Sequence, residues 1–245
     1  MYELLPNPPI VEAVLEIHVN PSPNITTDVL KSPDKKLFES FPEQRTRREI
    51  EGQYQLDAAE GKFNQQTRQE ITGYIYQSSN RKQVLQFLKT RYSFNQLHPY
   101  NSWEDFVENA RSNWENYYIG TAEPMNITKL RLRFLNHLHI PRTEDPSAYI
   151  TTYPSLPETI NDTINSYFYR IGLIDNDDIV SRAVHTLKPA KDESRVILVI
   201  DNSVEMTIHS DPDNPEIWKG FEKLRAKYYQ LFFELLTSKA IDLCK

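Results

Sequence analysis

The chain has very little cysteine and glycine for its 245 residues. Its one cysteine, Cys244, has no second thiol for a disulfide within the chain, and a zinc site made of several thiolates is excluded. We expect Cys244 to lie in a fraying terminal turn, which disfavours a cysteine nucleophile. The six glycines are scattered, so neither G-x-x-x-x-G-K-[ST] nor G-x-G-x-x-G is present. A P-loop or Rossmann protein is therefore disfavoured, and we expect no cofactor.

Long hydrophobic runs are also missing. The longest aliphatic run, residues 196–200, is far shorter than the about 20 apolar residues that cross a bilayer. Residues 1–9 lack the basic and apolar regions of a secretory signal. We therefore expect a cytoplasmic protein with no membrane contact. Acidic residues outnumber basic ones by 34 to 28, which disfavours a protein that coats nucleic acid through its overall field.

The chain does contain an aromatic pattern that occurs twice. Trp103 and Phe106 recur with the same spacing as Trp218 and Phe221. Further aromatic residues follow each pair at equal distances: Trp114, Tyr117 and Tyr118 in the first half, and Tyr229, Phe232 and Phe233 in the second. Repetition of this kind is typical of an internal duplication.

Each half is predicted to contain a strand, a helix, further strands and a long helix. Alternating apolar and polar residues predict strands over 10–19, 48–57, 70–77, 83–95, 128–140, 179–187 and 195–210, the last broken at Asp201-Asn202. Capping signals and helical spacing predict helices over 103–118, from Ser155 through Phe168, and from Pro215 to about Leu243. Residues 169–178 are polar and irregular, so one strand of the second half is predicted to be lost or shortened.

The fold that follows from these elements is α+β. We predict two tandem pseudo-repeats, residues 1–121 and 122–245, which form an antiparallel sheet packed by helices. The chain has no long linker between them, so we expect one compact body.

The strand predicted over 128–140 has the most distinctive polar pattern. Period-two geometry places five cationic or titratable side chains on one face: Lys129, Arg131, Arg133, His137 and His139. One interpretation is a groove for a phosphate-bearing ligand or nucleic acid. The other is that Glu12 and Glu16, on the strand predicted over 10–19, pair with Arg131 and Arg133 and neutralise them. We favour the ion-paired interpretation.

His137 and His139 have a spacing at which both imidazoles could contact one metal ion. A third ligand would have to be Glu12, Glu16 or His18, and such a set would suit a metal-dependent phosphoesterase. No established metal-binding motif accompanies the two histidines. We therefore expect them to be solvated or ion-paired, without a metal.

The last predicted helix has more apolar surface than one buried stripe requires. The stripe that should pack against the sheet has 3–4 spacing and consists of Phe221, Leu224, Tyr228, Leu231 and Leu235. A second apolar set on the same helix favours a contact with the other half or with another chain. We predict this interface to consist of Trp218, Tyr229, Phe232, Phe233 and Leu236.

The opening motif Asn7-Pro-Pro-Ile-Val-Glu-Ala-Val-Leu-Glu-Ile17 resembles that of a sporadically distributed, uncharacterised bacterial protein family. Other stretches are similar to the same family: residues 84–88, 95–100 with Trp103, 130–136 and 232–237. The family offers no activity, cofactor or catalytic residue to carry over. Its patchy distribution resembles that of mobile accessory genes, including those of toxin–antitoxin and phage-defence systems.

The predicted function is that of a non-enzymatic protein-interaction component. The sequence has no catalytic motif and no nucleotide-binding loop, and its last helix has surplus aromatic residues. The resemblance implies an accessory or antidote-like subunit of a toxin–antitoxin or phage-defence system. We expect the partner to be a protein encoded nearby or a second copy of the chain. The alternative is a phosphate-ligand or nucleic-acid binding protein, or a metal-dependent phosphoesterase, that uses the basic strand.

Overall fold

The computed structural model describes residues 5–23, 25–31, 35–57, 62–121, 125–160, 162 and 164–245. Nine antiparallel strands form one sheet in the order β2-β3-β4-β5-β1-β6-β9-β8-β7. The strands are β1 (Ile10–Asn20), β2 (Glu43–Asp57), β3 (Lys62–Gln77), β4 (Gln83–Leu88), β5 (Arg91–Leu97), β6 (Asn126–Pro141), β7 (Phe168–Ile174), β8 (Val180–Pro189) and β9 (Arg195–Ser210). The helices are η1 (Thr27–Leu30), α1 (Lys35–Ser40), α2 (Trp103–Thr121), η2 (Pro146–Ala148), α3 (Glu216–Leu235) and α4 (Ser238–Asp242).

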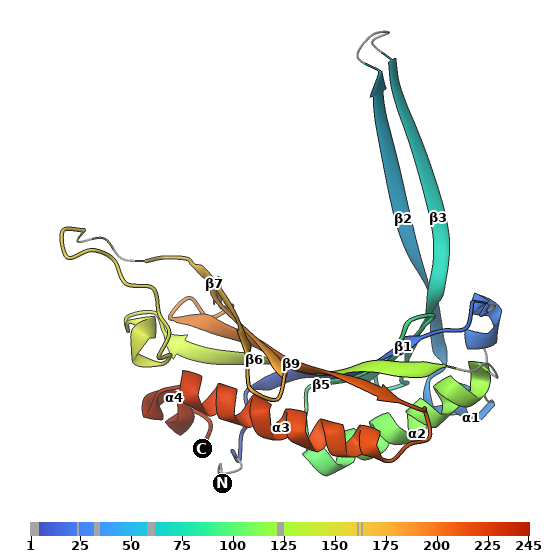
Figure 1. The fold of residues 1–245 in the computed structure, drawn as a ribbon. Helices are drawn as coiled ribbons and strands as arrows, with labels where there is room; N and C mark the ends of the chain where they lie inside the picture. The colour runs from blue at the N-terminus through green and yellow to red at the C-terminus, as the bar shows by residue number, and fades with distance from the viewer. Residues whose placement is uncertain are drawn as a thin grey trace.

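The sheet joins the two halves of the chain through its two central strands, β1 and β6. On one side of this pair lie β5, β4, β3 and β2 from the first half, and on the other lie β9, β8 and β7 from the second. Helices α2 and α3 lie on the same face of the sheet (Figure 1). The prediction of an α+β fold with helices on an antiparallel sheet is confirmed.

The core lies between this helix layer and the sheet. Trp103 and Phe106 of α2 and Phe221 and Leu224 of α3 are all buried in it. Helix α3 approaches β6 closely at Gly220, where an added Cβ would lie 2.6 Å from Cδ1 of Leu130. A side chain at this position would therefore require the end of the Leu130 side chain to move, and glycine allows α3 and β6 to approach without that shift.

Four strand predictions differ from the structure. β2 begins at Glu43 rather than at residue 48, and β3 begins at Lys62 rather than at residue 70. The strand predicted over 83–95 is a hairpin, in which β4 and β5 are joined by a turn at Lys89-Thr90. The break predicted at Asp201-Asn202 is absent, because both residues pair with β6 and β8 inside β9. Local turn preference is a weak signal when a strand has a neighbour on both sides.

Two helix predictions are also wrong. The helix predicted from Ser155 does not form, and residues 151–167 contain no helix or strand where they are described. The residues after it, which were predicted to be irregular, form β7 because they hydrogen-bond to β8. The last helix ends at Leu235, since Leu236 is extended and bridges to Ile150, and α4 follows as a separate helix.

No helix among the described residues is long and apolar enough to cross a bilayer. The β2–β3 hairpin stands away from the body on the face opposite to α2 and α3 (Figure 1). Only residues 73–77 of β3 pair with β4, so the hairpin beyond them has two strands. We call this part the arm.

Gly73 explains why the arm leaves the sheet. Its φ is +155°, and a Cβ there would lie 2.1 Å from the carbonyl oxygen of Phe87. The register of β2 shifts between Arg47 and Arg48, next to the pairing partner of Gly73. A bulge beside a glycine bends a strand pair, so these residues redirect the hairpin out of the sheet.

Candidate interaction surface

The face of the sheet opposite to the helices carries a lattice of charged side chains. Antiparallel pairing brings Glu16 of β1, Arg131 of β6 and Glu205 of β9 into one row across three strands. In the neighbouring rows, Arg133 and Asp201 lie on the same face. We call this surface the open face.

Glu16 is the most buried carboxylate of the open face, with 7% of its surface exposed. Its oxygens lie 3.1 Å from Nη1 of Arg91 and 3.2 Å from Nη1 of Arg131, and 3.3 Å from Nε2 of His18. Burial alone would raise the pKa of Glu16. The hydrogen bond with His18 and the charges of Arg91 and Arg131 outweigh burial and lower the pKa to about 2.

Arg133 has a stronger partner than the one predicted for it. Its Nε and Nη2 donate to Asp201 at 2.6 and 2.8 Å, and its Nη1 lies 3.7 Å from Glu12. The hydrogen bonds to Asp201 are the main reason why the pKa of Arg133 is raised. Lys129 lies 3.6 Å from Glu205.

The predicted pairing of Arg131 with Glu16 and of Arg133 with Glu12 is therefore present. The sequence did not reveal the partner on β9, because Asp201 looked like a turn residue. Carboxylates lie within ion-pair distance of Lys129, Arg131 and Arg133. Each of these three cations is therefore already paired within the chain.

His137 and His139 lie at the other end of β6. Burial and the charges of Lys188 and His139 lower the pKa of His137, and His139 is exposed. His18 pairs with Lys129, eight residues from His137 along the strand, which corresponds to about 27 Å. Among the residues that the structure describes, no group of three His, Cys, Asp or Glu side chains could hold a metal ion.

Two further arginines of the open face were not found from the sequence. Arg170 of β7 and Arg182 of β8 line a shallow depression of about 390 Å³ together with Arg131, Arg133 and Asp201. Over the described ranges, Arg170 and Arg182 make no ion pair within 4.0 Å. Arg182 lies in the strand predicted over 179–187, so its place in an alternating strand was an available signal. Arg170 lies in residues 169–178, which the sequence predicts to be irregular.

The edge strand β7 is the most unusual part of this surface. It pairs with β8 on one side and is the last strand of the sheet on the other. Three of its large apolar side chains are exposed: Phe168 by 71%, Ile174 by 69% and Leu173 by 46%. Soluble proteins usually protect such edges with charges or bulges, because unpaired strands recruit other strands.

The opposite edge of the sheet has this protection. The described exposed residues near the base of β2 include Arg45, Arg47, Arg48 and Glu49. The β2 edge therefore opposes strand addition, whereas β7 has few charges and is apolar on both faces.

The residues of α3 and its end that were predicted to form an interface mostly pack against the core of the same chain. Phe232 and Leu236 are buried, and Trp218, Tyr229 and Phe233 are half-buried against the core. Trp218 connects α3 to α2, since Arg111 lies over its ring at 5.9 Å. Two further contacts join the helices: Arg225 lies over Trp103 at 5.1 Å, and Nε1 of Trp103 donates to Glu222 at 2.6 Å. Phe232 and Leu236 are therefore not available at the surface of the folded chain.

The C-terminus does not fray as predicted. Asn7 donates from its backbone N to the carbonyl oxygen of Cys244 at 3.0 Å and from its side chain to that of Lys245 at 2.9 Å. Cys244 is buried, and burial raises the pKa of its thiol to about 11. A neutral buried thiol is a poor nucleophile, so the expectation that Cys244 is not catalytic rests on burial rather than on mobility.

No family model, no curated protein and no solved structure matches this chain.

Proposed function

We propose that this chain is a non-enzymatic interaction protein that binds a partner by adding a strand to β7. The observation that carries the proposal is the exposure of Phe168, Leu173 and Ile174 on an edge strand whose outer side is unpaired in the sheet. Added strands gain affinity from backbone hydrogen bonds and specificity from alternating side chains. The arm projects at the opposite end of the sheet, on the side of the open face (Figure 1).

A second copy of the chain is the partner that fits this edge. Antiparallel pairing of two β7 strands centred on Ile171 matches the following residues of the two copies: Phe168 with Ile174, Tyr169 with Leu173, and Arg170 with Gly172. Aromatic side chains then face aliphatic ones, which is a favourable cross-strand pairing. Gly172 has no heavy atom within 4 Å of an added Cβ, so the Arg170 side chain has room beside it. A shift by two residues would oppose Arg170 with Arg170, which disfavours that register.

The first test replaces Ile174 by lysine. We expect the wild-type chain to have twice its monomer mass of 28.8 kDa in light scattering at micromolar concentration, and Ile174→Lys to be monomeric. A charge on an edge strand opposes strand addition, and a residue that is 69% exposed contributes little to monomer stability.

Leu156→Lys is the matched control, because Leu156 is an exposed apolar residue outside the sheet. This variant should keep the wild-type mass. A monomeric wild-type chain would reject the second copy as partner, and a dimeric Ile174→Lys variant would place the contact elsewhere.

The alternative function, binding of a phosphate-bearing polymer, is favoured by one observation, the arginine-lined depression. If it operates, Arg170→Ala/Arg182→Ala should abolish binding of a fluorescent single-stranded oligonucleotide in fluorescence anisotropy, while Lys129→Ala, which removes a cation paired with Glu205, should retain most of it. Equal binding by both variants, or no binding by the wild-type chain at low salt, would reject this alternative.

We also propose that residues 1–121 and 122–245 are two copies of one ancestral unit. The strand order supports the proposal, because it runs outward from the central pair as β5, β4, β3 and β2 on one side and as β9, β8 and β7 on the other, so that the second half has one strand fewer. In each half, the strand next to the central pair is followed by the long helix. Superposition of β1, β5 and α2 on β6, β9 and α3 would test the relation, and dissimilar helix positions would reject it.

A further inference from the structure

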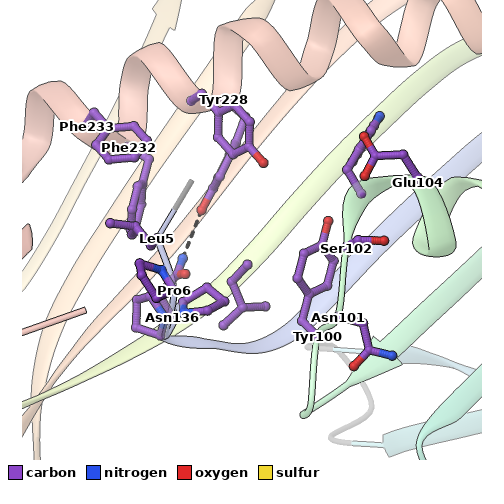
Figure 2. Close-up of a pocket in the computed structure, with 15 residues that line it drawn as sticks. Leu5, Pro6, Tyr100, Asn101, Ser102, Glu104, Asn136, Tyr228, Phe232 and Phe233 are labelled. Carbon is purple, nitrogen blue, oxygen red and sulfur yellow. Dashed lines mark hydrogen bonds between the residues drawn. The ribbon is translucent and has the colours of Figure 1, made fainter. Parts of the chain in front are cut away.

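A cavity of about 240 Å³ lies between the helix layer and the start of the chain. Its walls come from four segments that are far apart in the sequence: residues 5–10, residues 100–104, β6 and helix α3 (Figure 2). It lies on the helix side of the sheet, so it is separate from the open face and from the proposed contact at β7.

The wall formed by the opening segment is held at both ends. Asn7 is hydrogen-bonded to the C-terminus, and the carbonyl oxygen of Pro9 accepts from the backbone N of His137 at 2.9 Å. Leu5 packs against the main core. The cavity is therefore preformed in the folded chain, as small-molecule sites usually are.

The inner wall of the cavity is aromatic. Tyr228 packs on Phe134 with ring centroids 4.4 Å apart and is stacked with Phe232 at 5.9 Å. Tyr100 meets Phe134 edge to face at 5.7 Å. Fixed ring surfaces of this kind fit flat ligands, which can stack on them or meet their edges.

Two polar atoms in this apolar wall lack partners. Asn136 is fully buried, and its Nδ2 donates to Oη of Tyr228 at 2.9 Å, as Figure 2 shows. Its Oδ1, however, is buried without a hydrogen bond to any described residue, and the same is true of Oη of Tyr100. Buried polar atoms are normally satisfied, because an unsatisfied group loses its hydration without compensation.

The chemistry of these atoms defines what would satisfy them. Oδ1 of Asn136 can only accept a hydrogen bond, so the ligand must present a donor there. The hydroxyl of Tyr100 stays protonated, because burial raises its pKa, and it can donate to an acceptor on the ligand. Among the described residues that line the cavity, the one charged side chain is Glu104, which is exposed, so the interior suits an uncharged ligand.

We propose that this cavity binds a neutral, planar molecule of one or two rings that carries an N–H donor and a carbonyl or ring-nitrogen acceptor. Size supports this class, because a cavity of about 150 Å³ holds benzene, whereas drug-sized ligands need about 300 Å³ or more. A cavity of about 240 Å³ lies between these limits.

Benzamide is a suitable probe, because it joins one ring to an amide. We expect isothermal titration of the full chain with benzamide to show saturable binding at one site. Benzoate, which has a charge and no N–H donor, should bind at least tenfold more weakly. Asn136→Leu and Tyr100→Phe should each weaken benzamide binding by about tenfold, because each removes one buried hydrogen bond.

Tyr92→Phe is the matched control, since it removes a buried hydroxyl outside the cavity that donates to Ala110 at 2.8 Å. It should bind benzamide as the wild-type chain does. Absence of saturation with benzamide, or equal affinity in the Asn136 and Tyr100 variants, would overturn the proposal.

Thermal unfolding without any probe gives a second measurement. Tyr100→Phe should keep or raise the Tm, because the hydroxyl it removes has no partner, whereas Tyr92→Phe should lower it. A fall in Tm for Tyr100→Phe equal to that for Tyr92→Phe would show that the Tyr100 hydroxyl is already satisfied, and would overturn the proposal.

Discussion

Replacing Phe221 by alanine is expected to lower the free energy of unfolding by about 3–5 kcal/mol. Phe221 is fully buried on the face of α3 that packs against the sheet, and it contacts Trp218 with ring centroids 5.8 Å apart. Removing the ring loses its transfer free energy and leaves a cavity that the rigid sheet below cannot close. Urea unfolding followed by circular dichroism measures the loss.

Lys223→Ala, two residues further along the same helix, is the matched control. Lys223 is exposed, so its replacement should change the free energy of unfolding by less than about 0.5 kcal/mol. Equal stability of the two variants would mean that the packing face of α3 is not the one described.

Glu16→Gln is expected to cost about 3 kcal/mol at pH 7. The pKa of Glu16 is lowered from 4.5 to about 2, and each unit corresponds to about 1.4 kcal/mol. The variant also leaves Arg91 and Arg131 without the carboxylate that lies between them. Losing one partner of a buried ion pair typically costs about 3–5 kcal/mol, in agreement with this value.

The pH dependence of this loss identifies its cause. Because the pKa of Glu16 is lower in the folded state, its stabilisation is complete above about pH 4.5 and is lost as the pH falls through about 2. The difference between the wild-type chain and Glu16→Gln in urea unfolding should therefore shrink between pH 4.5 and 2. Exposed Glu108, changed to Gln, should show almost no difference at any pH. A constant difference for Glu16→Gln would point to lost packing rather than lost charge.

Much of the sheet and the helix layer could be predicted from the sequence. In the long central strand Asn126–Pro141 the burial of side chains alternates over most of its length, because one side faces the core and the other faces the charged lattice. In Ile10–Asn20 one face is apolar throughout and the other mixes Val14 with charged residues. Helix α3 was recognisable from its 3–4 spacing. Where one face of a strand or helix is buried, its apolar residues recur with the period of that element, and the sequence shows this period.

The wrong predictions lie in segments with few buried side chains, where apolar residues show no clear periodicity. Strand β7 is mostly exposed, with Ile171 partly buried against Ala183, Leu231 and Leu235. Its residues therefore show no clear division into an apolar and a polar side, and the pairing with β8 depends on a segment that lies elsewhere in the chain. The segment after Ser155 has a helix-start signal but nothing to pack against, and Leu156 and Ile160 remain exposed. Local signals of this strength do not determine a fold without tertiary contacts.

The candidate surface was found only in part for a related reason. The partners of Arg131 on β1 could be inferred from opposite charges on two strands, but the role of Asp201 depends on which strand lies on the other side of β6. Strand order is a property of the whole chain, and the cavity near Asn136 likewise requires four distant segments to meet. Neither is encoded in a local pattern.

The central position of β1 also has a consequence for how the chain is made. Its residue Glu16 contacts Arg131, which lies 115 residues later in the chain, so translation delivers β1 long before its second neighbour. Until β6 emerges from the ribosome, one edge of the apolar strand β1 has nothing to pair with, and exposed edges of this kind recruit wrong partners. Pairing of β6 with β1 therefore removes this exposed edge. Any change that slows the synthesis of the second half prolongs the time for which the first half is prone to aggregate.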